Sequence, residues 1–110
     1  VSTADVVTRW PDYREMGALN EHEIFGLQYG HGVGVGLWEF PILSRAFSIA
    51  NPVELVPGMC LALETYAGSE DKTDGIRLED MMVVTDTGIE VITKFPSDLV
   101  IGCGMPYLPQ

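Results

Sequence analysis

The sequence predicts an α+β fold in which an antiparallel sheet is flanked by a helix. A helix-start signal stands at the N-terminus, and glycines alternate with other residues from Leu27 to Leu37, which is typical of a strand. Two apolar segments, residues 59–66 and 76–85, are separated by a polar stretch and therefore predict a β-hairpin. With 110 residues, the chain can form one domain around one modest core.

The first expected element is a short amphipathic helix that Ser2 or Thr3 can cap. Its apolar side would carry Val6, Val7 and Trp10. Pro11 is expected to end or bend this helix, because proline cannot continue it without losing a hydrogen bond. Residues 17–26 are mixed and polar, and we expect them to connect this helix to the first strand.

The segment from Leu27 to Leu37 alternates with period two. One face carries four glycines, Gly30, Gly32, Gly34 and Gly36, which leave this part of the face without side chains. The opposite face carries His31, Val33, Val35 and Leu37. A strand face without side chains is usually tolerated where another backbone or a ligand approaches closely. The spacing does not match the GxGxxG turn of a dinucleotide site, and no helix-forming segment follows it.

Residues 40–58 are rich in proline and small polar residues, so we expect an irregular connection over the surface. A turn at Pro57 and Gly58 then leads into the hairpin, whose strands are Met59–Tyr66 and Ile76–Thr85. A tighter turn precedes a third strand, Ile89–Thr93. Together these strands predict a three-stranded antiparallel meander.

Two glutamates face each other if the hairpin pairs symmetrically about its loop, because Glu64 then lies opposite Glu79. Like charges across a ladder destabilise an exposed sheet by up to about 1 kcal/mol, and a buried one by more. Arg77, a shared proton or a bound cation could compensate them. A register shifted by one residue would instead place one glutamate in water, and the sequence alone leaves both registers open.

With His31, these carboxylates form one imidazole and two acidic groups on three strands, a ligand set that suits manganese, iron, cobalt or zinc. The ordinary alternative is a histidine buried in the core without a ligand role. Three ligands are few for a two-metal hydrolytic site, so further ligands are expected upstream of this chain.

The formal charge of −10 opposes binding to nucleic acid or to an anionic membrane, and we expect neither partner. The carboxylate excess suits either a solvated surface or a site whose bound cations offset the charge. Cys60 and Cys103 form no CxxC pair, which favours reduced thiols and a cytoplasmic setting. The chain opens at Val1 without Met, so we expect it to be a fragment that lacks preceding sequence.

Four segments resemble, in order and spacing, the motifs of the pita-bread metalloenzymes, the family of proline aminopeptidase, prolidase and creatinase. Residues 30–34, followed by Trp-Glu-Phe-Pro at 38–41, resemble the GHGIG and HExP segments. The other three segments are residues 57–64, 76–80 and 83–93, which are similar to the family's PGM and following glutamate strand, its RIED motif and its closing VTxxGxExLT hairpin. The resemblance spans nearly the whole chain.

This resemblance implies that residues 1–110 are the C-terminal part of a pita-bread catalytic domain, an α+β fold with a curved antiparallel sheet. In that family, two upstream aspartates join one histidine and two glutamates around two divalent metal ions. The matching metal ligands here are His31, Glu64 and Glu79. Glu64 would also be the catalytic group that accepts a proton from the attacking water. The expected partners are the upstream part of the domain and a small-molecule or peptide substrate, and a homodimer is left open.

Trp38 departs from the family pattern, because it replaces the histidine of the HExP segment. An indole has no acceptor and cannot transfer a proton, but its face attracts quaternary or sulfonium groups by about 0.5–2 kcal/mol. The segment from Leu37 to Arg45 also resembles the branch that contains dimethylsulfoniopropionate lyases. We therefore assign Trp38 and Arg77 to substrate binding, with packing of Trp38 in the core as the alternative. The hypotheses are a metal-dependent hydrolase related to Xaa-Pro peptidases, a lyase on the same scaffold, and a non-catalytic binding module.

Overall fold

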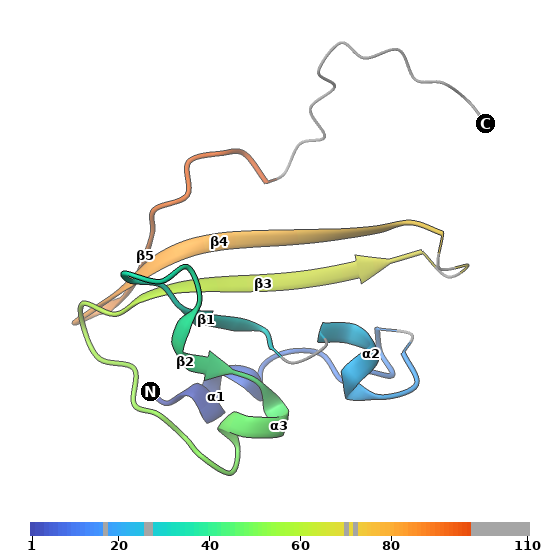
Figure 1. The fold of residues 1–110 in the computed structure, drawn as a ribbon, viewed down its shortest axis with the longest axis horizontal. Helices are drawn as coiled ribbons and strands as arrows, with labels where there is room; N and C mark the ends of the chain where they lie inside the picture. Colours follow the sequence, from blue (N-terminus) through green and yellow to red (C-terminus); the bar gives the residue numbers. More distant parts are fainter. Residues whose placement is uncertain (17, 26–27, 70, 72, 98–110) are drawn as a thin grey trace.

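The computed structural model describes residues 1–16, 18–25, 28–69, 71 and 73–97, and these form a five-stranded antiparallel sheet with three short helices (Figure 1). The helices are α1 (Thr3–Val7), α2 (Glu21–Phe25) and α3 (Arg45–Ser48). The strands are β1 (Gly30–Gly32), β2 (Glu39–Leu43), β3 (Cys60–Gly68), β4 (Gly75–Thr85) and β5 (Gly88–Val91), in the spatial order β2-β1-β3-β4-β5. The predicted α+β class with an antiparallel sheet is confirmed. Within the described ranges, no helix has the length and apolar character that crossing a membrane requires.

Helix α1 begins where the sequence predicts it, and Ser2 is the cap. The Ser2 hydroxyl accepts a hydrogen bond from the Asp5 backbone N–H, and the Asp5 carboxylate accepts one from the Ser2 backbone N–H at 2.8 Å. This reciprocal capping box satisfies two backbone donors and holds the pKa of Asp5 below its usual value. The helix ends at Val7, so it is shorter than predicted and does not include Trp10.

The connection predicted between the first helix and the first strand contains a short helix, α2, which the sequence analysis did not predict. Asn20 accepts a hydrogen bond from the His22 backbone N–H at 3.0 Å through its side-chain oxygen. The Glu23 carboxylate accepts another from the Leu19 backbone N–H at 2.8 Å. These side chains satisfy backbone donors at the start of a single turn of helix that has no strong apolar period to reveal it.

The irregular connection predicted for residues 40–58 is wrong in part, because it contains most of β2 and all of α3. Strand β2 tolerates Pro41 because it lies at the edge of the sheet, where one side of the strand needs no hydrogen bond. The Ser48 hydroxyl accepts from the Ser44 backbone N–H at 3.0 Å and donates to the Ile42 carbonyl at 2.9 Å. The turn from β2 into α3 is therefore held by one buried side chain.

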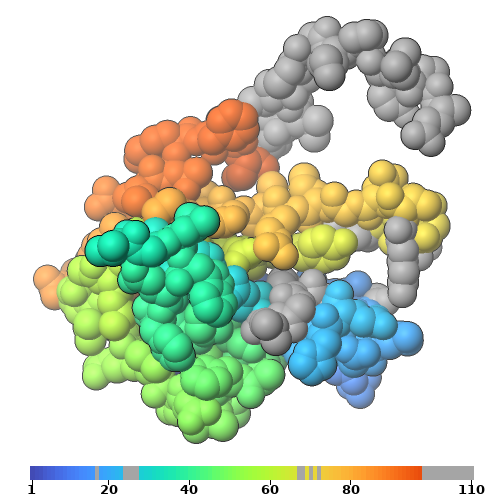
Figure 2. Space-filling view, in the orientation of Figure 1, coloured from blue at the N-terminus to red at the C-terminus, as the bar shows by residue number. Residues whose placement is uncertain are grey.

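The long strand predicted from Leu27 to Leu37 is reduced to β1, and Leu27 lies outside the described residues. Residues 33–38 bend back instead, and the Glu39 carboxylate accepts a hydrogen bond from the Gly36 backbone N–H. The bend leaves Val35 and Leu37 exposed rather than on the face of His31. In Figure 2, the teal segment lies at the surface of the face that is shown.

The glycines of β1 itself lie where another backbone approaches closely, as the sequence pattern predicts. A Cβ atom on Gly30 would lie 2.4 Å from the Ala62 carbonyl oxygen of β3, and one on Gly32 would lie 2.2 Å from the Phe40 carbonyl oxygen of β2. These two residues therefore allow β1 to lie between its neighbours, while His31 between them points to the opposite face.

The predicted hairpin is confirmed as β3 and β4, which pair from Cys60 with Val83 to Gly68 with Gly75. Its register places Glu64 directly opposite Glu79, so the alternative register shifted by one residue is excluded. Strand β5 follows as predicted and completes the meander. The two faces of the sheet differ. One face contributes Leu43, Leu61 and Met82 to the buried core, which also contains Val7 and Tyr29, and the other face carries His31 and Glu64.

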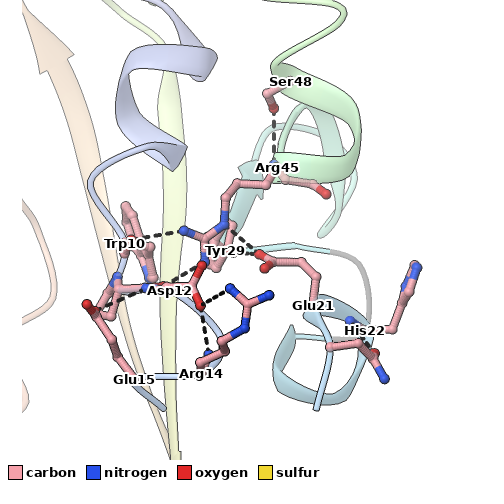
Figure 3. Close-up of polar contacts among 12 residues, drawn as sticks. Trp10, Asp12, Arg14, Glu15, Glu21, His22, Tyr29, Arg45 and Ser48 are labelled. Atoms are coloured by element: carbon pink, nitrogen blue, oxygen red, sulfur yellow. Dashed lines mark hydrogen bonds and ion pairs between the residues drawn. The ribbon is translucent and has the colours of Figure 1, made fainter. Parts of the chain in front are cut away.

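The Arg45 side chain joins α3 to two segments that precede the sheet (Figure 3). It donates to Glu21 Oε1 at 2.6 Å, to the Trp10 carbonyl at 2.9 Å and to the Pro11 carbonyl at 2.6 Å. The guanidinium also lies 5.0 Å from the centroid of the Tyr29 ring, whose hydroxyl donates to Glu21. The planar guanidinium is suited to such divergent contacts, which an ammonium group would not reproduce.

Replacing Arg45 with Ala is expected to lower the free energy of unfolding by about 2–3 kcal/mol, because hydrogen bonds to charged groups contribute about 1.5–3 kcal/mol and two carbonyls lose their donor. Urea denaturation measures this change. Arg14→Ala is the matched control, since its ion pair with Asp12 is solvent-exposed and should contribute less than about 1 kcal/mol. Equal losses in the two variants would contradict a structural role for the Arg45 contacts.

Candidate metal centre

His31 and Glu64 lie on the same face of adjacent strands. His31 of β1 is paired with Ala62 of β3, and Glu64 stands two residues further along β3, so both side chains project to one side. Only 6% of His31 and 4% of Glu64 is exposed. The His31 Nε2 atom lies 3.7 Å from Glu64 Oε1. The sheet thus brings together two of the three ligands expected from the sequence.

The orientation of the His31 ring fixes which nitrogen can bind a cation. Its Nδ1 atom lies 3.0 Å from the Gly32 carbonyl oxygen, which can only accept a hydrogen bond. Nδ1 therefore carries the hydrogen, and in the neutral ring Nε2 keeps its lone pair on the side of Glu64. Histidines that bind metals usually donate their other ring nitrogen in this way.

Each oxygen of the buried Glu64 carboxylate has its own donor. Arg77 Nη1 lies 2.6 Å from Oε2, and Gln28 Nε2 lies 2.8 Å from Oε1. The side chain of Arg77 is 54% exposed, so part of it remains accessible to solvent while it contacts Glu64. Of the compensating groups considered from the sequence, Arg77 is the one that contacts Glu64 in the structure. This charge-assisted hydrogen bond offsets part of the cost of burying the carboxylate.

Trp38 comes to this site from the bend that follows β1. Its indole Nε1 donates to Gln28 Oε1 at 2.6 Å, and its ring centroid lies 6.2 Å from that of His31. The alternative that Trp38 packs in the core is wrong, because 56% of the residue is exposed. The indole therefore contacts Gln28 and lies near the His31 ring while more than half of the residue is exposed.

Gln28 is a site residue that the sequence did not reveal. In the predicted strand, its even number would place it on the glycine face, away from His31. The chain is not yet extended at Gln28, because β1 begins only at Gly30, so the period-two rule does not apply to it. Neither composition nor spacing predicts a role for Gln28, since a single glutamine before a strand is an ordinary feature.

Glu79 lies opposite Glu64 in the ladder but is exposed. Within the described ranges, no group of three or more His, Cys, Asp or Glu side chains lies close enough together to hold a metal ion. The pair of His31 and Glu64 nevertheless fits a shared cation, because atoms that each lie about 2.0–2.2 Å from one ion are separated by no more than about 4.4 Å. The ligand role of all three residues stays a prediction.

Comparison with known proteins identifies the class. Residues 1–86 match metallopeptidase family M24, and the chain belongs to this family. The chain is 34% identical over 98 residues to the uncharacterized peptidase YqhT of Bacillus subtilis. This match covers 89% of this chain and 25% of that protein. It is 31% identical over 94 residues to the dimethylsulfoniopropionate lyase DddP of Roseovarius nubinhibens, covering 80% of this chain and 21% of the relative.

Among solved structures, the chain is similar to the X-Pro aminopeptidase from Thermotoga maritima, with a TM-score of 0.64 and 28% identity over 87% of this chain and 25% of that chain. The dipeptidase PepE from Mycobacterium ulcerans gives a TM-score of 0.60 at the same identity. These likenesses confirm the predicted membership of the pita-bread metalloenzyme family, and the relatives include a dimethylsulfoniopropionate lyase, as predicted. The chain spans about a quarter of the length of the curated relatives described above.

Proposed function

We propose that this chain supplies part of the metal site of a hydrolase related to Xaa-Pro peptidases. The observation that carries the proposal is the buried pair of His31 and Glu64, in which His31 Nε2 lies 3.7 Å from Glu64 Oε1 while Nδ1 lies 3.0 Å from the Gly32 carbonyl oxygen. Glu79 from the adjacent strand would be the third ligand, and two aspartates from an upstream part of the domain would complete a site for two divalent ions. A mixed imidazole and carboxylate set accepts manganese, iron, cobalt or zinc.

Bound divalent ions would supply Lewis-acid polarisation of the scissile carbonyl and an activated water. The residues of this chain would hold the site and move the proton. Glu64 is the proposed acceptor of the proton from the attacking water, because its carboxylate is buried and fixed by Gln28 and Arg77. The Arg77 side chain is about half exposed while it holds Glu64, so it could also bind an anionic group of the substrate.

The second candidate is a lyase that acts on a small sulfonium zwitterion, and the position of Trp38 favours it. The exposed indole lies beside His31, where its face can attract a cationic group by about 0.5–2 kcal/mol. Its Nε1 hydrogen is already donated to Gln28, so the indole would act through its face rather than as a hydrogen-bond donor. One relative carries the name of a dimethylsulfoniopropionate lyase.

Cys60 is a free thiol, which supports the further proposal of a reducing, cytoplasmic setting.

Assays of the intact enzyme against an Xaa-Pro dipeptide and against dimethylsulfoniopropionate test these candidates. The expected result is stoichiometric transition metal by elemental analysis and turnover of the dipeptide that stops when a chelator removes the metal. Turnover of dimethylsulfoniopropionate alone would replace the hydrolase with the lyase. A protein without stoichiometric metal would contradict both and favour a binding module. The isolated 110 residues should be inactive, because two of the five proposed ligands lie outside them.

A further inference from the structure

Gln28 links the two sides of the candidate site. Its amide nitrogen lies 2.8 Å from Glu64 Oε1, and its amide oxygen accepts the indole hydrogen of Trp38 at 2.6 Å. We propose that Gln28 is a positioning residue that couples the exposed Trp38 to Glu64, so that cation binding at Glu64 and the position of the indole depend on each other. This inference rests on the proposed metal role of Glu64.

The two partners of Gln28 leave its amide with one orientation. An ionised carboxylate can only accept hydrogen bonds, and an indole nitrogen can only donate one. The amide nitrogen must therefore face Glu64 and the amide oxygen must face Trp38, as they do in the structure. Methionine at this position would fill the space without either contact, and glutamate would place a second carboxylate against Glu64.

The oxygen that Gln28 holds is the one nearest His31. Glu64 Oε1 accepts the Gln28 amide and lies 3.7 Å from His31 Nε2, whereas Oε2 is held by Arg77. A cation shared by His31 and Glu64 would draw on Oε1, and the amide bonded to that atom would shift with it. Because the same amide holds the indole, the displacement would be transmitted to Trp38.

Trp38 is a suitable receiver for this displacement because it lies on a bend rather than in a strand. The bend is held at one end by the contact between Glu39 and Gly36, and the indole reaches the site through Gln28 and the His31 ring. A small change in the amide therefore reorients a largely exposed ring. In the intact enzyme, this link would change the position of the Trp38 indole at the substrate site when the metal binds.

The test uses the intact enzyme with ¹⁵N-labelled tryptophan, stripped of metal by a chelator and titrated with Zn²⁺. The Trp38 indole resonance, assigned with Trp38→Phe, is expected to shift as Zn²⁺ binds to the wild-type protein. In Gln28→Met, the metal-free resonance should move upfield through loss of its acceptor and should no longer respond to Zn²⁺. The Zn²⁺ affinity measured by calorimetry should fall about 10- to 100-fold, as for other residues that orient metal ligands.

Gln28→Asn is the second variant, in case the methionine variant does not fold. Its amide is one methylene shorter and cannot reach both partners, so it should also uncouple the indole from Zn²⁺ binding. The Trp10 resonance is an internal control. Gln28 accepts a hydrogen bond from the Trp38 indole, so the Trp10 resonance should move less than the Trp38 resonance. A Trp38 resonance that still follows Zn²⁺ in both variants, with unchanged affinity, would overturn the inference. Wild-type protein that binds no Zn²⁺ would instead overturn the metal-site proposal beneath it.

Discussion

Glu64→Gln is expected to lower kcat/KM of the intact enzyme by about 10²–10⁴-fold, the range typical of losing a general base. The amide keeps the size of the side chain and can still accept a hydrogen bond from Arg77. It loses the negative charge that would attract a cation beside His31 and the basicity needed to accept a proton. Elemental analysis of the variant should show reduced metal content, and steady-state kinetics should show the rate loss.

Glu90→Gln is the matched control for this substitution. Glu90 lies on β5 opposite Val83, on the same face of the sheet as Glu64, but it is exposed. The control should change neither the metal content nor the rate, although it removes the same charge from the same face. A Glu64→Gln enzyme with full metal content and wild-type activity would show that Glu64 has neither role. Circular dichroism of both variants checks that they are folded.

The part of the site that the sequence could predict is the part that regular backbone geometry determines. Symmetry about the hairpin loop places Glu64 opposite Glu79, and the alternation within β1 places His31 away from its glycine neighbours. Both follow from period-two geometry in strands that the structure confirms. The contact of Gln28 with Glu64 joins an irregular segment to a strand 36 positions away, and no local pattern encodes it.

The same distinction explains which elements of the fold were missed. The hairpin has long apolar strands and turn residues, so pattern and structure agree. Helices α2 and α3 have five and four residues, too few to display a helical period. The strand predicted to Leu37 stops at Gly32 because Glu39 folds back on the Gly36 backbone, an interaction that overrides the alternating pattern. Side-chain contacts of this kind decide where an otherwise plausible strand ends.

Gly32→Ala is expected to destabilise the protein by about 3 kcal/mol, the upper part of the range for overpacking. The new Cβ atom would lie 2.2 Å from the Phe40 carbonyl oxygen and 2.7 Å from its carbonyl carbon. Both atoms belong to the backbone of β2, so no side-chain rotation relieves the overlap, and β1 and β2 must separate. Alanine also restricts the unfolded chain, but this gain of about 0.4–1 kcal/mol is too small to compensate.

Gly75→Ala separates steric overlap from the general effect of adding a methyl group to a strand. Its Cβ atom would meet the Tyr66 hydroxyl, the far end of an exposed side chain that can rotate away. We therefore expect a change of less than about 1 kcal/mol in urea denaturation, in the stabilising direction. Because Gly32 adjoins His31, the destabilising variant should also weaken Zn²⁺ binding in the fraction that remains folded. Equal stability of the two variants would mean that β2 can shift without cost, and that the glycine next to His31 is not required for the close approach of these strands.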